Sequence, residues 1–210
     1  MAAQTLLITV GMMVTTSVIN SFGSGTVAAY TVGNKVEQLA TVLFSQVAFS
    51  FSVFAGQNFG ARRYDRMRRS VRVCLGMAAG VTVFMTALIL AVGRPMLGMF
   101  TDDAHVVEMG MSIIRLIVPT WITYLCIEIL SGAMRGAGDS LMPTLMTLTG
   151  VCLMRVFWVT VVVPRMHQLP VLMLSYPITW VITSCMFIVY YLRGRWLDRC
   201  IARQGSVQKP

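Results

Sequence analysis

Apolar stretches of about 20 residues recur through this chain, and their length constrains its fold more than any other feature. A helix rises about 1.5 Å per residue, so a stretch of this length crosses the hydrocarbon core of a bilayer. Six stretches are long enough, and we expect each to be a transmembrane helix: residues 3–22, 27–60, 73–92, 111–132, 143–163 and 171–192. Turn-forming residues between them, including Gly23, Pro95, Gly138, Pro164 and Pro170, indicate hairpin connections. The predicted fold class is an all-α membrane protein.

Composition excludes the common soluble classes. Of the 210 residues, 56% are hydrophobic and 12% are charged, whereas a soluble domain carries about 25% charged residues. A disordered chain, a disulfide scaffold and an ordinary soluble domain are therefore excluded. We expect one transmembrane lobe over residues 1–192 and a basic tail over residues 193–210. The N-terminal apolar run lacks a basic flank and is longer than a signal core, so we expect it to be retained as structure.

The placement of positive charge predicts the orientation in the membrane. The chain has 17 Lys and Arg residues against 8 Asp and Glu. Twelve of the basic residues lie on one side of the expected spans: Arg62, Arg63, Arg66, Arg68, Arg69, Arg72, Arg135, Arg193, Arg195, Arg199, Arg203 and Lys209. Lys35, Arg94 and Arg165 lie on the other side. Because basic loops are retained in the cytoplasm, both termini should be cytoplasmic.

Two basic segments have more than one interpretation. Residues 62–72 fit contact with anionic lipid headgroups or an acidic partner, or they anchor the topology and do nothing more. Nucleic acid is disfavoured as a partner, because a short loop between two spans has little freedom to follow a duplex. In the tail, Trp196, Leu197, Cys200 and Ile201 share one helical face with arginines around it. This pattern predicts a helix at the membrane interface rather than a dedicated ligand site.

The residues needed for common enzyme and metal chemistry are missing or dispersed. The five cysteines include no C-x-x-C pair, and the two histidines, His105 and His167, have no ligand spacing. An intramembrane serine protease needs a histidine within a span, and no expected span contains one. We therefore expect no metal, no cofactor and no enzymatic activity.

Three ionisable residues in the expected spans are candidates for ion coupling, namely Glu128, Glu37 and Arg155. A charge near the bilayer centre costs about 2.5–3.5 kcal/mol on insertion scales, so such residues are functional candidates by default. Arg155 lies 12 residues after Pro143, or about 18 Å along the helix, near mid-depth. Glu128 differs from it in depth by roughly 12 Å, so a direct ion pair would strain both side chains. Glu37, beside Lys35, is equally consistent with an interfacial position.

Polar and aromatic residues of the expected spans could line a hydrated cavity between helices. The candidates for the substrate cavity are Asn20, Asn34, Gln46, Trp121 and Tyr124. For the neutral polar residues, interhelical hydrogen bonds that only hold the bundle together explain the pattern equally well.

Small residues and prolines predict close packing and bends. Three pairs of glycines have the G-x-x-x-G spacing: Gly56 and Gly60, Gly76 and Gly80, and Gly132 and Gly136. Such pairs allow two helix backbones to approach closely. Pro119 and Pro177 lie inside expected spans and predict interruptions there, as in the broken helices of transporters.

Several phrases, in the same order along the chain, resemble the multidrug and toxic compound extrusion (MATE) family. They are Phe22-Gly23 with Val27-Ala28-Ala29-Tyr30, Gly56-Gln57-Asn58-Phe59-Gly60-Ala61, the run from Leu130 to Ser140 with Pro143, Cys152 with Arg155 and Trp158, and Ser175-Tyr176-Pro177 before Trp180. The resemblance covers almost the whole chain.

This resemblance implies one six-helix lobe of a two-lobe transporter. Members of the family are secondary antiporters that export cationic and amphipathic compounds in exchange for protons or sodium ions. The chain resembles the second lobe, which implies a lipid bilayer, small-molecule drugs and a complementary N-terminal lobe or second copy as partners. Some branches carry acids in the seventh and tenth helices. Here the first span has no acid, and Trp121 and Tyr124 occupy the region of the second.

Three alternatives remain beside an exporter. A related lipid-linked flippase or a small-solute carrier would keep the helices and change the cavity lining. A structural fragment without transport activity would also share the sequence pattern. A cavity rich in basic groups would favour a flippase of anionic lipid, but Arg155 is the one basic residue at depth, which favours the exporter.

Overall fold

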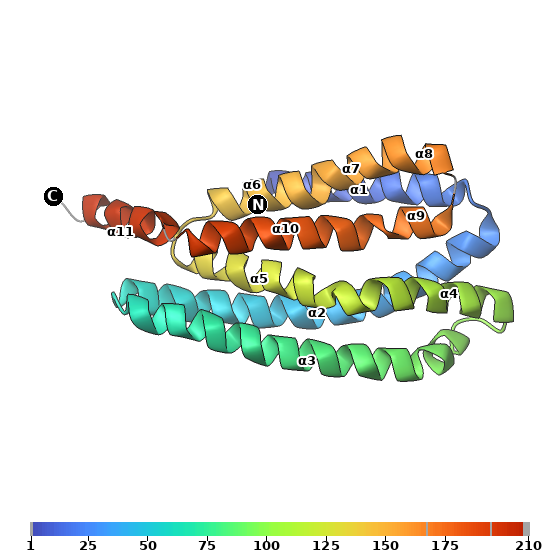
Figure 1. Ribbon diagram of the computed structural model, residues 1–210, viewed down its shortest axis with the longest axis horizontal. Helices are drawn as coiled ribbons and strands as arrows, with labels where there is room; N and C mark the ends of the chain where they lie inside the picture. The colour runs from blue at the N-terminus through green and yellow to red at the C-terminus, as the bar shows by residue number, and fades with distance from the viewer. Residues whose placement is uncertain (1, 167, 194, 208–210) are drawn as a thin grey trace.

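The computed structural model describes residues 2–166, 168–193 and 195–207, which form helices without strands. Figure 1 shows most helices running side by side along one axis. The elements are α1 (Ala2–Asn20), α2 (Ser24–Gly60), α3 (Tyr64–Gly98), α4 (Ala104–Ile117), η1 (Val118–Thr120), α5 (Trp121–Gly136), α6 (Leu141–Thr147), η2 (Leu148–Leu153), α7 (Met154–Phe157), η3 (Trp158–Val162), α8 (Val163–Met166), α9 (Leu169–Met173), α10 (Ser175–Leu192) and α11 (Arg195–Val207). Here η1 is a 3₁₀-helix, and η2 and η3 are π-helical.

Among the described residues, four helical segments are long and apolar enough to cross a membrane. They are α3, α4 through α5, α6 through α8, and α9 through α10. These segments contain the predicted spans 73–92, 111–132, 143–163 and 171–192, and the chain is a membrane protein. Helices α1 and α2 cover most of the predicted spans 3–22 and 27–60. Several of their side chains lie outside the described residues, and the number of six spans stays a prediction.

The structure corrects two expected connectors at the ends of α3. The segment from Arg62 to Arg72 is not a loop, because α3 begins at Tyr64 and includes its last four arginines. Arginine favours helix, and Asp65 in the first turn is favourable beside the positive end of the helix dipole. The turn expected at Pro95 is also wrong, since α3 continues to Gly98. Gly93 is buried against Met111 of α4, so packing holds the helix together there.

The interruptions predicted at two prolines are confirmed. Pro119 lies in η1, a single 3₁₀ turn between α4 and α5. Pro177 lies in the first turn of α10, and α9 ends four residues before it, at Met173. Proline has no N–H to donate to the carbonyl four residues earlier, and its ring crowds that carbonyl. The chain therefore changes helix at these points.

Glycines allow α2 and α5 to pack with their backbones almost in contact. A Cβ atom added to Gly132 would lie 3.0 Å from the carbonyl oxygen of Ala48. A Cβ atom on Gly56 would lie 3.2 Å from the carbonyl oxygen of Gly136. By contrast, Gly80 has nothing within 4 Å of such an atom. The G-x-x-x-G prediction therefore holds for Gly132 and Gly136, where the backbone of α5 lies directly against that of α2.

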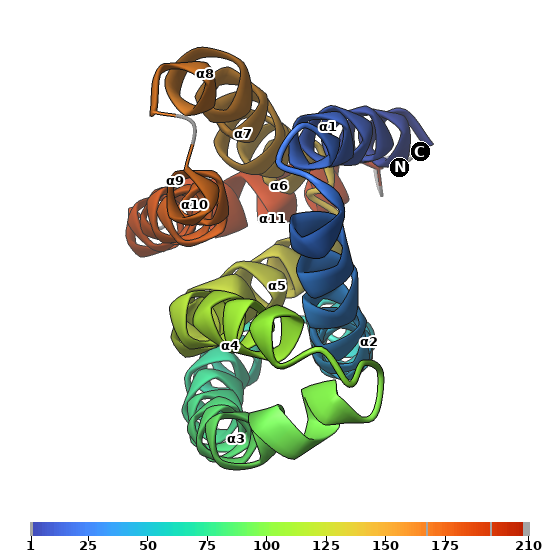
Figure 2. The same ribbon diagram turned by 90° about the vertical axis from the view of Figure 1, so that its right-hand side faces the viewer.

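The continuous segment from α4 to α5 forms the centre of the lobe. Figure 2 shows it between α3 on one side and α10 on the other. Half of its apolar stretch is buried, against 11% of the stretch in α3. Trp121 is buried and packs edge-on against Phe44 of α2, with 5.6 Å between ring centroids. Helix α3 thus presents its apolar side chains outward, as a helix facing lipid does.

The tail residues 195–207 form α11, whose apolar face packs on the protein. Trp196, Leu197 and Cys200 are all buried, and the Trp196 ring lies 5.6 Å from the ring of Tyr191 in α10. The predicted face is thus confirmed, and it is covered by protein. The position of α11 at the membrane interface stays a prediction. Arg199 donates a hydrogen bond to the Tyr190 hydroxyl at 3.0 Å, which ties α11 to the end of α10.

Candidate functional site

Three polar side chains of α2 lie on a single face of the helix. Tyr30, Asn34 and Glu37 follow one another at spacings of four and three residues, which align on a helix. All three are half-buried, and they line a small pocket with Trp121 and the last turns of α4. The pocket encloses about 10 Å³, enough for roughly one water molecule. This pocket is therefore too small for a drug-sized compound.

Arg155 reaches the same region from α7, which lies between the π-helical stretches η2 and η3. Its guanidinium lies 4.0 Å from the ring centroid of Tyr176 in α10, and its Nη2 donates to Thr179 Oγ1 at 3.4 Å. π-Helical turns often occur at functional sites, because they rotate the following side chains out of the α-helical register. A guanidinium over an aromatic face gains a cation–π interaction of about 0.5–2 kcal/mol, which grows as the guanidinium loses water, and Arg155 is half-buried.

Two tyrosines connect the two sides of this cluster. The hydroxyl groups of Tyr30 and Tyr176 lie 2.9 Å apart, within hydrogen-bonding distance across α2 and α10. Glu37 of α2 and Arg155 of α7 are close enough to interact electrostatically. We refer to Tyr30, Glu37, Arg155, Tyr176 and Thr179 as the Arg155 cluster.

Two buried polar atoms near this cluster have no hydrogen-bond partner among the described residues. They are Arg155 Nε and Ser175 Oγ. Buried polar groups are otherwise almost always hydrogen-bonded, and an unpaired one costs free energy. Arg155 Nε can only donate a hydrogen bond, whereas Ser175 Oγ can donate or accept one, so a water molecule could satisfy either atom.

A second polar group lies further along α5. Glu128 and Arg135 are both partly buried and form an ion pair, with 3.7 Å between Oε2 and Nη2. Tyr124, one turn before Glu128, interacts with Glu128 and with Ser45 of α2. We refer to these four residues as the Glu128 cluster.

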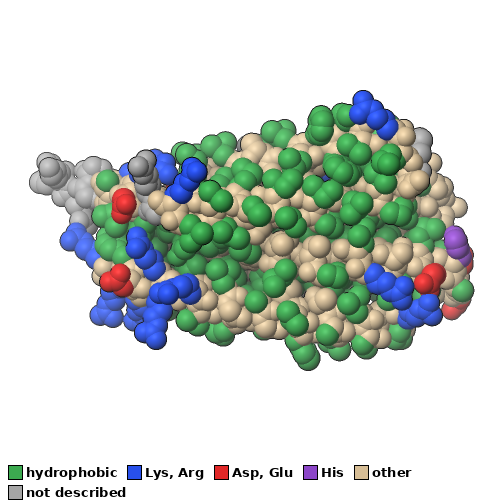
Figure 3. Space-filling view, viewed as in Figure 1, with side chains coloured by type: hydrophobic (Ala, Val, Ile, Leu, Met, Phe, Trp, Pro, Cys, Tyr) green, Lys and Arg blue, Asp and Glu red, His purple; other side chains and the backbone are tan. Residues whose placement is uncertain are grey.

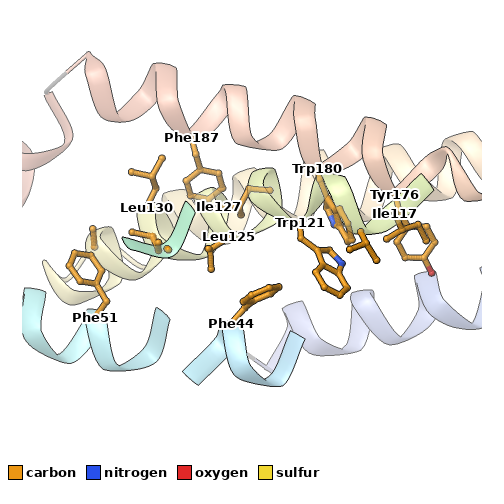
Figure 4. Close-up of a cluster of buried hydrophobic side chains, with 14 of the residues drawn as sticks. Phe44, Phe51, Ile117, Trp121, Leu125, Ile127, Leu130, Tyr176, Trp180 and Phe187 are labelled. Carbon is orange, nitrogen blue, oxygen red and sulfur yellow. The ribbon is translucent and has the colours of Figure 1, made fainter. Parts of the chain in front are cut away.

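Aromatic rings connect the two clusters. The ring centroids of Tyr124 and Trp180 lie 5.3 Å apart, and those of Trp180 and Tyr176 lie 5.8 Å apart. Figure 4 shows Trp121, Trp180 and Tyr176 between the ribbons of α10 and α2. The rings of Tyr124, Trp180 and Tyr176 thus lie between the charged residues of the two clusters. These rings are apolar, but each carries a hydroxyl or an indole N–H group.

The structure brings together most of the residues that the sequence identified. Glu37 and Arg155 lie in one cluster, next to Asn34 and Trp121 in the small pocket, and Glu128 and Tyr124 lie in the other. Arg155 and Glu128 have separate partners, as their difference in depth suggested. Asn20 and Gln46 are exposed and belong to neither cluster.

Tyr30, Tyr176 and Thr179 were not identified as site residues. The sequence does contain a pattern that could have identified them, since Tyr176, Thr179 and Thr183 are spaced by three and four residues and so form a polar face on an otherwise apolar helix. The described residues contain no group of three or more metal-ligating side chains, and His167 lies outside them.

Comparisons with known proteins give relatives over almost the whole chain. A probable multidrug resistance protein of Bacillus subtilis, YoeA, is 23% identical over 200 residues, which are 94% of this chain and 43% of the relative. The probable multidrug resistance protein NorM of Thermotoga maritima is 19% identical over 99% of this chain and 45% of the relative. The chain thus spans less than half the length of these relatives.

Solved structures match the fold. An outward-facing multidrug resistance MATE transporter of the MOP superfamily superposes with a TM-score of 0.83 at 17% identity, covering 94% of this chain and 45% of that one. A MOP superfamily transporter from Pyrococcus furiosus superposes with a TM-score of 0.82 at 16% identity, covering 92% and 42%. These relatives are transporters and not enzymes. The sequence profile MatE matches residues 1–160, more than half of the chain, and the chain therefore belongs to the MatE family of multidrug and toxic compound extrusion proteins.

Proposed function

We propose that this chain forms the C-terminal six-helix lobe of a secondary antiporter that exports cationic or amphipathic compounds in exchange for protons or sodium ions. Membership of the MatE family and the coverage of less than half of each relative support this proposal. The single observation that carries the ion-coupled part is the Arg155 cluster, in which Glu37 and Arg155 lie among apolar helices. Ionisable groups in such places mark ion and substrate pathways.

In this proposal Glu37 and Glu128 are the groups that exchange the coupling ion. Each carboxylate has a positively charged neighbour, Arg155 for Glu37 and Arg135 for Glu128. A proton or sodium ion that binds a carboxylate weakens its attraction to the arginine. The arginine side chain is then available to move, and a change in occupancy becomes a change in the contacts between helices.

The substrate would lie between two lobes, because the pocket lined by Tyr30, Asn34 and Glu37 holds about one water. Asn34 and Tyr124, both half-buried, would contribute to one wall of that cavity, whereas Trp121 is buried within this lobe. Asn20 and Gln46 are exposed and would meet the compound or the second lobe. The second lobe is a complementary N-terminal lobe or a second copy of this chain, in a bacterial inner membrane with both termini of this chain in the cytoplasm.

Coexpression with a complementary lobe tests the proposal. The chain should confer no resistance alone, whereas coexpression with the N-terminal half of a full-length relative should restore ion-dependent efflux in inverted membrane vesicles. A cell line that expresses only the N-terminal half is the matched control. Robust export by the purified monomeric chain would contradict the two-lobe proposal. Efflux that does not respond to either a proton or a sodium gradient would contradict antiport.

A further inference from the structure

A pocket at the corner between α10 and α11 is not used by the proposed transport function. Tyr190, Arg193, Trp196 and Arg199 line it, and it has a volume of about 570 Å³. This volume falls in the range of small-molecule sites, which is roughly 300–1,000 Å³. Two of its four lining residues are arginines and the other two are aromatic.

The position of the pocket corresponds to a membrane boundary. The apolar segment Leu169–Leu192 is long enough to span a bilayer, and α11 begins three residues after it ends. Tyrosine and tryptophan are enriched at the level of lipid headgroups, and Tyr190 and Trp196 would lie at this level. Figure 3 shows blue Lys and Arg side chains gathered at the end of the molecule where α11 lies, beyond a long apolar surface.

The walls of the pocket are held in place by protein contacts. Arg199 donates to the Tyr190 hydroxyl at 3.0 Å, and that hydroxyl lies 3.4 Å from Oδ2 of the buried Asp139. Trp196 is 2% exposed and packs on Tyr191. Helix α11 is therefore fixed against the bundle, and the arginines stand at defined positions instead of on a mobile tail.

The charge around the pocket is positive. Arg68 and Arg72 of α3 act electrostatically on the neighbouring Tyr191, and Arg199 and Arg203 act on Cys200. With Arg193, five arginines surround this corner. The acids in the same region are Asp139, which is buried beside Tyr190, and the exposed Asp198. An anion would be attracted here, since guanidinium groups form paired hydrogen bonds with phosphate oxygens.

Exposed apolar side chains of α10 lie next to this pocket. Ile188, Val189 and Leu192 are all exposed at the end of α10. Arg193 follows Val189 by four residues, so the two lie on the same face of the helix. A molecule with its phosphate at Arg193 would therefore have acyl chains against this face.

We propose that the pocket binds the phosphate of an anionic phospholipid between the guanidinium groups of Arg193 and Arg199, with its acyl chains along the exposed face of α10. The bound lipid would join α11 to the transmembrane helices. This assignment does not depend on transport, on the coupling ion or on the presence of a second lobe.

Native mass spectrometry of the full chain in detergent tests the proposal. Phosphatidylglycerol and phosphatidylcholine are added separately, and the affinity of the first lipid molecule is measured. The wild type should bind phosphatidylglycerol about tenfold more tightly than phosphatidylcholine, and Arg193→Gln with Arg199→Gln should remove this preference. Arg165→Gln, the same change at an exposed arginine of α8, should leave it unchanged.

Further variants separate lipid binding from loss of structure. Arg193→Gln alone leaves the bond between Arg199 and Tyr190 intact, and it should reduce the preference severalfold with unchanged helicity by circular dichroism. Millimolar inorganic phosphate should fail to displace the lipid. The proposal is overturned if the double variant keeps the preference, if phosphatidylcholine binds as tightly, or if inorganic phosphate competes fully, which would make the pocket a site for soluble phosphate.

Discussion

At the scale of single residues, the lobe places an acidic and a basic side chain together in each of two clusters. Arg155 has the Tyr176 ring and Thr179 as neighbours, and Glu37 lies within electrostatic range. Glu128 has Arg135 and Tyr124. Each charge therefore has a polar or aromatic partner, which reduces the cost of holding it among apolar helices. This arrangement yields separate predictions for stability and for coupling.

Replacing Arg155 should destabilise the lobe. Arg155→Leu removes the cation–π contact and the bond to Thr179 and leaves Glu37 without its nearby positive charge, so we expect a loss of about 1–3 kcal/mol. The melting temperature in detergent should fall by several degrees. Arg165→Leu removes an exposed arginine of α8 and should change it by less than one degree. Equal melting temperatures for the two variants would show that the Arg155 contacts contribute nothing.

Replacing Glu128 should impair coupling more than folding. Glu128→Gln keeps the size of the side chain and removes the charge that pairs with Arg135. In an assembly of two lobes, ion-driven efflux should fall about tenfold or more at normal membrane levels. Glu108→Gln, the same change in the exposed ion pair of Glu108 with Arg94, is the control. If transport and its dependence on pH and sodium are unchanged, Glu128 has only a structural role in α5, and Glu37 becomes the better candidate.

At the scale of elements, the contact between α2 and α5 depends on the absence of side chains. A Cβ atom at position 136 would collide with the Ser52 carbonyl and lie 2.9 Å from Ala55 Cβ and from the Gly56 nitrogen. Gly136→Ala should therefore destabilise the lobe by roughly 1–3 kcal/mol, the usual cost of overpacking. Gly80→Ala meets open space and should stabilise α3 by up to about 1 kcal/mol. Thermal unfolding of both variants measures the difference, and a Gly136→Ala protein as stable as the wild type would contradict this packing.

The same elements show what could be predicted from the sequence. Apolar runs of spanning length predicted the bodies of α3 and α5, because burial in lipid requires continuous hydrophobicity. The breaks at Pro119 and Pro177 were predictable from the missing backbone donor. The extension of α3 through Pro95 was not predictable from the sequence, because the packing of Gly93 on α4 overrides the preference of glycine and proline for a turn. Helix ends near water depend on such tertiary contacts, which periodicity does not contain.

The candidate site was predictable to the extent that charge in an apolar span is costly. Glu37, Arg155 and Glu128 were found in this way. Tyr30 and Tyr176 were missed because a tyrosine in a transmembrane helix is unremarkable until its partner is known, and the two are 146 residues apart in sequence. The apolar face of α11 was predictable, but its burial against protein was not, because an amphipathic helix can pack either on lipid or on protein.

At the scale of the whole molecule, the distribution of arginines predicts the orientation. Asp65 in the first turn of α3 and Asp103 before α4 lie at opposite ends of the long helix α3, and both are exposed. In a cysteine-free background, Asp103→Cys should react with a membrane-impermeant maleimide in intact cells, because that end carries few basic residues. Asp65→Cys should react only after the cells are permeabilised.

The native Cys200 would be a poor reporter of orientation, which is why matched substitutions are needed. It is 5% exposed, and burial, followed by the charge of Asp139, raises the pKa of its thiol. A thiol with a raised pKa is mostly protonated at neutral pH and reacts slowly from either side of the membrane. Failure to label Cys200 from outside therefore has two explanations, whereas Asp65 and Asp103 are both exposed. Labelling of Asp65→Cys in intact cells, with Asp103→Cys protected until permeabilisation, would reverse the orientation and place the α10–α11 corner outside the cell.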